Sequence, residues 1–224
     1  MRKFFLLLLL YLVQQVHAQE ISVVSVKQLP KSSIGKSYHP KFSPNGEYLL
    51  LTSDNYSGLK KFDLKNEQVS IITEAPNAGY NVQISADGNN IIYREQSFNK
   101  RNMRETALKK IDLTNKKENQ LISPTRDLQL HKTINGNLVY VKNNKLSTKR
   151  IYGEKIKTVP DIVNIENRQL VLYRNGERKE ISPNGKDCSY LWPSISPDGT
   201  KLLCNSGRLF LVPYTKDFGR ITRF

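Results

Sequence analysis

Histidine is scarce in this chain, with only His17, His39 and His131 among 224 residues. Histidine is the side chain most often used in acid–base catalysis and the commonest metal ligand, so its scarcity narrows the possible chemistry. No His, Cys or carboxylate has the spacing of a metal partner for His131. Neither a Gly-x-Ser-x-Gly nucleophile motif nor a phosphate-binding glycine loop is present. We therefore expect no catalytic residue, no cofactor and no metal site.

Long apolar runs are also missing, apart from residues 4–13. This run follows basic residues, ends at Gln14 and precedes a small-residue cleavage signal at residues 16–18. It is shorter than the ~17–25 apolar residues that a membrane-spanning helix needs. The pattern is typical of a secretory signal peptide over residues 1–18, cleaved between Ala18 and Gln19. We expect the mature chain to be periplasmic or secreted, with no transmembrane segment.

Cysteine occurs only twice, at Cys188 and Cys204. A disulfide would be allowed in an exported protein. However, the expected hairpin places Cys204 opposite about Leu191, which leaves the two cysteines roughly 10 Å apart by strand rise. That separation exceeds the ~7 Å limit for a bridge. We expect two free thiols, and a bridge formed through a shifted register is the alternative.

Acidic residues are fewer than basic ones: the chain has 20 Asp and Glu and 35 Lys and Arg, which gives a net charge of +15. Between residues 97 and 157 the chain has 15 Lys and Arg against 5 Asp and Glu. A basic surface attracts anionic polymers, acidic proteins or membrane headgroups. Nucleic acid is not the expected partner, because no recognition motif is present. The candidate interaction loop contains Lys100, Arg101 and Arg104, and a simply solvated basic surface is the alternative.

One segment is repeated three times in the sequence. Residues 38–46 and 191–199 share the pattern Tyr/Leu-x-Pro-x-apolar-Ser-Pro-Asp/Asn-Gly, and residues 80–88 are a weaker copy. Pro, Asn, Asp and Gly favour a tight turn, and each turn precedes a short apolar run typical of a buried strand. The turn acids and amides, Asn45, Asp87 and Asp198, share one repeat position and are expected to be structural.

The repeat continues beyond the turn. Residues 59–66 match residues 108–115 at an offset of 49, whereas the preceding turns are 42 residues apart, which predicts a longer loop at residues 95–107. A fourth strand is expected after each match, and Asp63 and Asp112 end the third strands. Four antiparallel strands in ~40–45 residues form one blade of a β-propeller. The predicted fold is all-β, with about four to five blades.

These motifs resemble the WD40-like repeat of TolB-type β-propellers. Residues 19–37 would form a lead-in segment and residues 38–224 the propeller, with blades at 38–73, 80–122, 127–159, 160–183 and 190–224. The resemblance is vague between residues 127 and 183, where turns are expected at Asn135-Gly136 and Asn175-Gly176. The family usually has six blades, which is more than this chain can hold. Three alternatives remain: a small four- or five-bladed ring, an open array completed by a partner, or a truncated member of the family.

The resemblance implies a non-enzymatic binding module that mediates contacts with a protein partner or an anionic cell-envelope component. One alternative is a polysaccharide-acting, lyase-like propeller enzyme, or the remnant of a propeller-containing hydrolase. His39 or His131 would then have to supply the catalytic base. Another alternative is a non-functional relative that never completes its ring.

Overall fold

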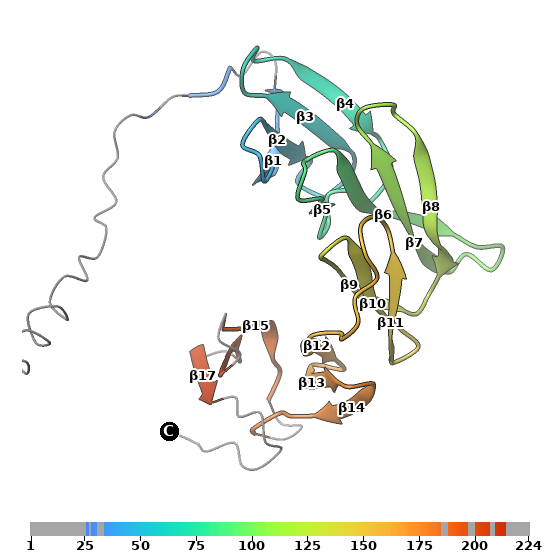
Figure 1. The fold of residues 1–224 in the computed structure, drawn as a ribbon, viewed down its shortest axis with the longest axis vertical. Coiled ribbons are helices and arrows are strands. Elements are labelled where there is room, and N and C mark those ends of the chain that lie inside the picture. Colours follow the sequence, from blue (N-terminus) through green and yellow to red (C-terminus); the bar gives the residue numbers. More distant parts are fainter. Residues whose placement is uncertain are drawn as a thin grey trace, which may run out of the picture.

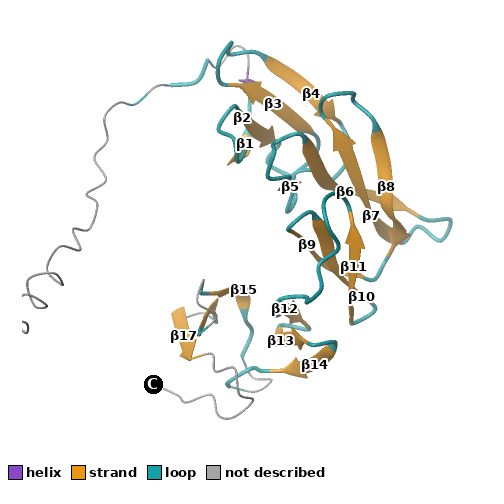
Figure 2. Cartoon of the chain, viewed as in Figure 1, coloured by secondary structure: helices purple, strands orange, loops and turns teal. Residues whose placement is uncertain are grey.

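Five antiparallel sheets make up the computed structural model of the chain (Figure 1). The structure describes residues 26, 28–30, 34–184, 188–196, 200–206 and 209–213. Figure 2 shows strands joined by loops, with one short helical stretch before β1. The expected all-β propeller architecture is therefore confirmed.

The first two sheets have four strands each, in sequence order. Sheet 1 contains β1 (Tyr38–Phe42), β2 (Tyr48–Thr52), β3 (Leu59–Asp63) and β4 (Val69–Thr73). Sheet 2 contains β5 (Gln83–Ile84), β6 (Asn90–Phe98), β7 (Arg104–Asp112) and β8 (Glu118–Thr125). Four strands per blade is what the two long sequence repeats predict.

The remaining sheets have three strands each within the described residues, not the expected four. Sheet 3 contains β9 (Leu128–Ile134), β10 (Asn137–Lys142) and β11 (Lys145–Arg150). Sheet 4 contains β12 (Ile162–Glu166), β13 (Gln169–Arg174) and β14 (Glu177–Glu180). Sheet 5 contains β15 (Leu191–Ile195), β16 (Lys201–Asn205) and β17 (Leu209–Pro213).

Sheets 3 and 4 are compact because two-residue turns join all of their strands. Both central residues have positive φ in each turn, as a type I′ hairpin requires. The turns expected at Asn135-Gly136 and Asn175-Gly176 are confirmed, and two more occur at Asn143-Asn144 and Asn167-Arg168. Such short turns let two sheets fit between the second and fifth.

The serine of the repeated turn holds each copy closed. The backbone N–H of Ser43 donates to the Tyr48 carbonyl at 2.9 Å, and the Ser43 Oγ accepts from the Tyr48 N–H at 3.0 Å. Ser85 and Ser196 make the same pair of bonds to the residue five positions on. The three copies are thus one structural unit repeated in three sheets.

The second position of the repeat also has one backbone conformation in all three copies. His39, Asn81 and Trp192 have φ values of 51°, 53° and 49°. A bulge interrupts strand pairing at His39 and at Trp192, where one extra residue lies opposite the neighbouring strand. A shared backbone geometry, not a shared chemistry, explains why this position accepts such different side chains.

The core lies between neighbouring sheets. Successive side chains of the middle strands point to opposite faces, so that alternate residues pack against the sheet before and the sheet after. On β6, Ile91 and Tyr93 pack against sheet 1, whereas Ile92 packs against sheet 3. Four such clusters join sheets 1 to 5 in order. The outer face of sheet 1 packs instead against Leu29 and Ile34 of the lead-in segment.

Two details differ from expectation. The residues predicted to form a longer loop at 95–107 mostly extend β6 and β7, which pair from Asn90↔Asp112 to Phe98↔Arg104. In sheet 5, Leu191 pairs with Asn205 and not with Cys204. The strands already pair as Ile195↔Leu202 next to the turn, which is two residues from the expected register, and the bulge offsets this difference by one residue. Cys188 and Cys204 are both free, and burial raises the pKa of the Cys204 thiol.

Candidate functional site: an arginine-lined cavity

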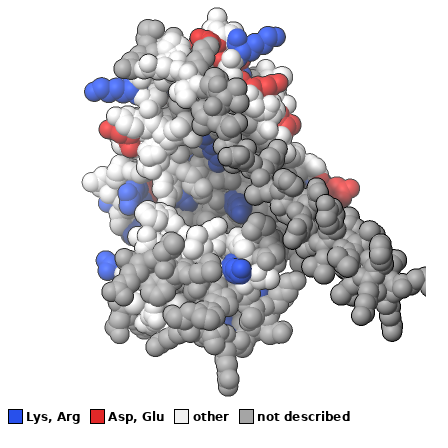
Figure 3. Space-filling model, turned by 90° about the vertical axis from the view of Figure 1, so that its left-hand side faces the viewer, with Lys and Arg blue, Asp and Glu red and all other residues white. Residues whose placement is uncertain are grey.

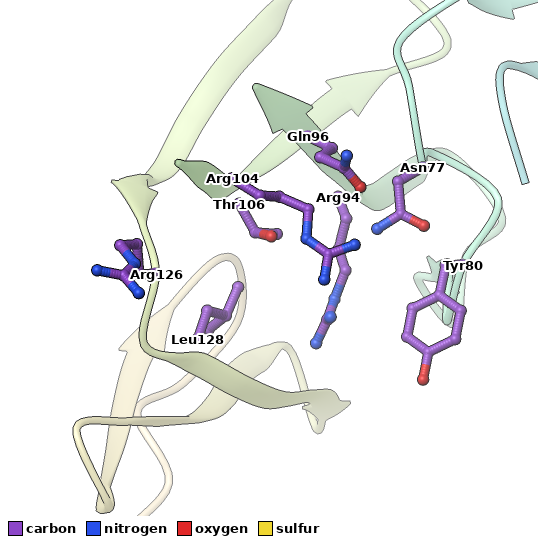
Figure 4. Close-up of a pocket in the computed structure, with 8 residues that line it drawn as sticks. All are labelled: Asn77, Tyr80, Arg94, Gln96, Arg104, Thr106, Arg126 and Leu128. Carbon is purple, nitrogen blue, oxygen red and sulfur yellow. The ribbon is translucent and has the colours of Figure 1, made fainter. Parts of the chain in front are cut away.

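A cavity of about 360 Å³ lies where sheets 2 and 3 meet the loop that joins sheets 1 and 2. We call it the arginine cavity (Figure 4). The strands β6 and β7, the β4–β5 loop, the bend between β8 and β9 and the start of β9 supply its lining residues, which are Asn77, Tyr80, Arg94, Gln96, Arg104, Thr106, Arg126 and Leu128. This volume lies within the ~300–1,000 Å³ range of small-molecule sites.

Arg94 is the buried cation of this cavity, with 8 % of its surface exposed. Its Nε donates to His131 Nδ1 at 3.2 Å and its Nη2 donates to the Gln129 carbonyl at 3.0 Å. Its guanidinium carbon lies 5.2 Å from the centre of the Tyr80 ring, in cation–π range. These contacts fix the guanidinium in place, but none of them neutralises its charge.

No Asp or Glu of the described residues forms an ion pair with Arg94. Burial without a counter-ion lowers the pKa of the Arg94 guanidinium, although arginine stays charged in proteins. Arg174, which is 9 % exposed, shows the usual arrangement. Its Nε and Nη2 donate to Asp161 Oδ2 at 2.9 and 2.6 Å. A buried charge without an ion-pair partner is costly, which makes the Arg94 guanidinium a candidate for binding an anion.

Two more arginines line the same space. Figure 4 shows the Arg104 side chain reaching from β7 toward Arg94, while Arg126 lies on the far side beside Leu128. Neither Arg104 nor Arg126 forms an ion pair within the described part of the chain. All charged lining residues are therefore positive, and the other polar ones are neutral amides and hydroxyls.

His131 supports Arg94 from behind and is 1 % exposed. Burial and the adjacent Arg94 charge lower the pKa of His131 to about 3, so the ring is neutral at ordinary pH. Because Nδ1 accepts from Arg94, the proton of the neutral ring lies on Nε2, which has no partner among the described atoms. The Asn81 side chain also donates to the His131 carbonyl at 3.0 Å. His131 acts here as a positioning residue.

Aromatic rings extend from the cavity toward sheet 1. Tyr80 meets Tyr56 edge to face at 5.5 Å between ring centres, and Tyr56 stacks on His39 at 4.2 Å. Tyr80 is 46 % exposed. His39 is thus a surface residue in an aromatic row, as its variable repeat position predicts.

The candidate interaction loop is divided by the structure. Arg104 lines the cavity, whereas Lys100 and Arg101 lie at the exposed tip of the β6–β7 hairpin. The predicted cleavage site at Ala18 and Gln19 lies outside the described residues. Sequence reasoning missed Arg94 and Arg126.

The turn carboxylates that the structure describes accept hydrogen bonds within their own turns, whereas Asp198 lies outside the described residues. Asp87 accepts from the Asn89 backbone at 3.0 Å and from the Ser85 hydroxyl. Asp63 and Asp112 accept backbone N–H bonds in the turns that follow β3 and β7. No group of three or more His, Cys, Asp or Glu side chains suited to a metal ion occurs in the described segments.

A second cavity, of about 390 Å³, lies against sheet 1. Its charged lining residues are of both signs, Lys36 and Lys60 against Asp54 and Glu74. Such a lining compensates its own charge. The arginine cavity does not, which makes it the stronger candidate for a binding site.

Figure 3 shows how charged surfaces are distributed on one face of the molecule. Lys and Arg surfaces occur in the upper, central and lower parts of this view, whereas the Asp and Glu surfaces lie in its upper half. Of the described residues, none belongs to a helix long and apolar enough to cross a membrane.

Comparisons with known proteins identify the fold. No family model matches the sequence, and no curated protein matches it. The tricorn protease matches with a TM-score of 0.53 and 12 % identity, over 80 % of this chain and 25 % of that protein. The β-propeller domain of the Trilobed protease from Pyrococcus furiosus, described as having an open velcro topology, matches with a TM-score of 0.51 and 13 % identity. The match covers 81 % of this chain and 69 % of that domain. TolB from Acinetobacter baumannii matches with a TM-score of 0.45 and 15 % identity, over 81 % of this chain and 55 % of that protein.

At these identities the likeness concerns the fold alone, and this chain spans a quarter of the tricorn protease. The repeated turns, the antiparallel sheets and the cores between them agree with that likeness. The chain therefore has the fold of the β-propeller proteins.

Proposed function

We propose that this chain is an exported, non-enzymatic binding module whose arginine cavity holds an anionic group of a protein partner or cell-envelope component. The observation that carries the proposal is Arg94, a buried guanidinium without a carboxylate partner in the described chain. An anion in the cavity would supply the missing charge, and charge-assisted hydrogen bonds are the strong ones.

Binding is favoured over catalysis because His131 is held neutral behind Arg94. A general base must reach the proton it removes, but the Nδ1 of His131 is already occupied by Arg94 and its Nε2 is buried. The arrangement fixes a cation, which is what recognition of an anion requires.

The test uses Arg104→Gln and a matched control, Arg101→Gln, which removes the same charge from the exposed hairpin tip. Calorimetric titrations with phosphate, sulfate and poly-L-glutamate are compared for the two variants and the unchanged chain. We expect Arg104→Gln to weaken binding of at least one anion roughly tenfold, the value of one charge-assisted hydrogen bond. Arg101→Gln should bind as the unchanged chain does.

Two results would contradict the proposal. One is that no anion binds at ~0.15 M salt, where exposed charges are largely screened beyond ~8 Å. The other is an equal loss in both variants, which would mean that the overall positive charge attracts anions without a site.

A further inference from the structure

We infer that the arginine cavity binds a phosphate monoester carried by a sugar-sized polar group. This inference rests on the proposed function and narrows it from any anion to one class of ligand. Three features of the cavity carry it: the number of positive charges, the donors that remain on Arg94, and the neutral space beside them.

The charges call for more than one negative charge on the ligand. Arg94 and Arg104 reach into the same space, and Arg126 lines its far side, with no acidic residue among the lining residues. A carboxylate would neutralise one of these cations. A phosphate monoester carries about −1.5 to −2 at pH 7 and offers three strong acceptor oxygens. It therefore matches two facing guanidinium groups better than a carboxylate does.

Arg94 is already oriented for such a ligand. Two of the five N–H donors of a guanidinium are used, by His131 and by Gln129, and the others have no partner among the described residues. A planar guanidinium binds phosphate oxygens through two parallel bonds. Because its position is fixed before binding, little side-chain entropy is lost when the ligand arrives.

The cavity is larger than a phosphate group alone requires. Its volume of about 360 Å³ is more than ten times the ~30 Å³ share of one liquid water molecule. Asn77, Gln96, Thr106 and Tyr80 supply uncharged donors and acceptors beside the arginines. These groups suit the hydroxyls of a sugar, and the half-exposed Tyr80 ring offers an apolar surface to its carbon atoms.

Calorimetric titration of the purified chain compares five probes: glucose 6-phosphate, glucose 6-sulfate, glucuronate, inorganic phosphate and glucose. We expect glucose 6-phosphate to bind at least roughly tenfold more tightly than glucuronate, because one further charge-assisted contact is worth about that much. Inorganic phosphate should bind more weakly than glucose 6-phosphate, because it leaves the neutral side empty. Equal affinity for inorganic phosphate and glucose 6-phosphate would assign the cavity to free phosphate and overturn the inference that the ligand carries a sugar.

The pH dependence of binding separates a phosphate from a sulfate ester. The second phosphate pKa lies near 6, so acidification from pH 7.5 to 5 removes one charge from glucose 6-phosphate and none from the sulfate. The titratable and charged groups that face the ligand are Arg94, Arg104, Arg126 and the Tyr80 hydroxyl. Behind them, His131 on β9 contacts Arg94, and the charge of Lys41 on β1 lowers the pKa of His131. Any titration of the protein affects both esters, so their affinity ratio isolates the ligand.

We expect glucose 6-phosphate to lead at pH 7.5 and its advantage over the sulfate to shrink toward pH 5. A ratio that stays constant would overturn the inference. In addition, Arg104→Lys keeps the charge but loses the paired donors, so it should weaken phosphate ester binding severalfold, while Arg101→Lys should have no effect. Both variants change exposed residues, which avoids the folding risk of altering Arg94.

The outcomes also separate this inference from the proposed function. Tight binding of glucuronate or poly-L-glutamate without glucose 6-phosphate would end the inference and leave an anion-binding module. Failure of every anionic probe would end both.

Discussion

At the scale of single residues, the serine of the repeated turn explains why so short a motif recurs. Ser43 is 3 % exposed, and its hydroxyl oxygen accepts the N–H of Tyr48, the first residue of the buried strand β2. Without this oxygen a buried donor at the entrance of the strand would lose its partner.

Replacing Ser43 by Ala should therefore lower the free energy of unfolding by about 1–3 kcal/mol, the cost of an unsatisfied buried donor. Urea unfolding measures it as a lower midpoint with an unchanged slope. Ser70→Ala, on the exposed side of β4, is the control and should change stability by less than ~0.5 kcal/mol. Equal effects of the two substitutions would contradict the structural role of the turn serine.

Residue-scale reasoning from sequence predicted the repeat but not the site. Arg94 occupies the repeat position held by Thr52 and Asn205 in the other copies, and a charged residue there was the available signal. Its meaning depends on His131 and Gln129, which lie more than 30 positions later. Only the packing of sheet 2 on sheet 3 brings these residues together, and no local pattern records that packing.

At the scale of elements, the long β6–β7 hairpin and β8 are joined by an ion-pair network. Lys109 on β7 lies 2.9 Å from Glu95 on β6 and 2.8 Å from Glu118 on β8. The Tyr93 hydroxyl also donates to Glu118. Burial alone would raise the pKa of Glu118, but the bonds from Lys109 and Tyr93 outweigh it and leave the pKa below its ordinary value of 4.5.

A carboxyl with a lowered pKa in the folded state stabilises the fold above its unfolded pKa and ceases to do so as the pH falls through the folded value. Glu118→Gln should thus cost less than ~1 kcal/mol near pH 7, because the pair is partly exposed. The difference from the unchanged chain should disappear progressively below pH 4.5. Thermal unfolding from pH 3 to 7 measures this, with Glu177→Gln as an exposed control; a gap that widens in acid would refute the network.

Elements were predictable to different degrees. The Asn-Gly hairpins could be predicted because those residues favour positive φ. Asn167-Arg168 forms the same turn, with φ values of 49° and 67°, but arginine carries no such preference. The lengthening of β6 and β7 was missed because residues 95–107 are polar, and cross-strand hydrogen bonds rather than an apolar pattern hold them in register.

At the scale of the whole molecule, the five sheets follow one another along an arc, with sheets 1 and 5 at its two ends (Figure 1). Each core cluster lies between two consecutive sheets. In such arrays stability is approximately a sum of nearest-neighbour terms. Damage to one interface should therefore remain local.

Leu138→Ala removes a fully buried side chain between sheets 2 and 3 and should cost about 2–5 kcal/mol. Hydrogen exchange should accelerate in β6–β8 and β9–β11, with little change in β16. Leu203→Ala is the control, because Leu203 is 40 % exposed and its removal should cost less than ~1 kcal/mol. Uniform acceleration across all five sheets would show one cooperative unit instead.

The fold as a whole was predictable because the copies repeat at blade length and carry a buried strand each. The three-stranded form of sheets 3 and 4 was not, because these two sheets lack the repeated turn and depend on contacts with their neighbours for their extent.

The packing of Leu29 and Ile34 on the outer face of sheet 1 has a consequence for assembly. That face is where an additional blade would dock if it used the same kind of interface as the others. Because the chain's own lead-in segment already occupies this face, an additional blade would first have to displace that segment. Leu29 and Ile34 therefore cover the exposed face of the first sheet, and a further blade could pack there only by competing with this covalently attached segment.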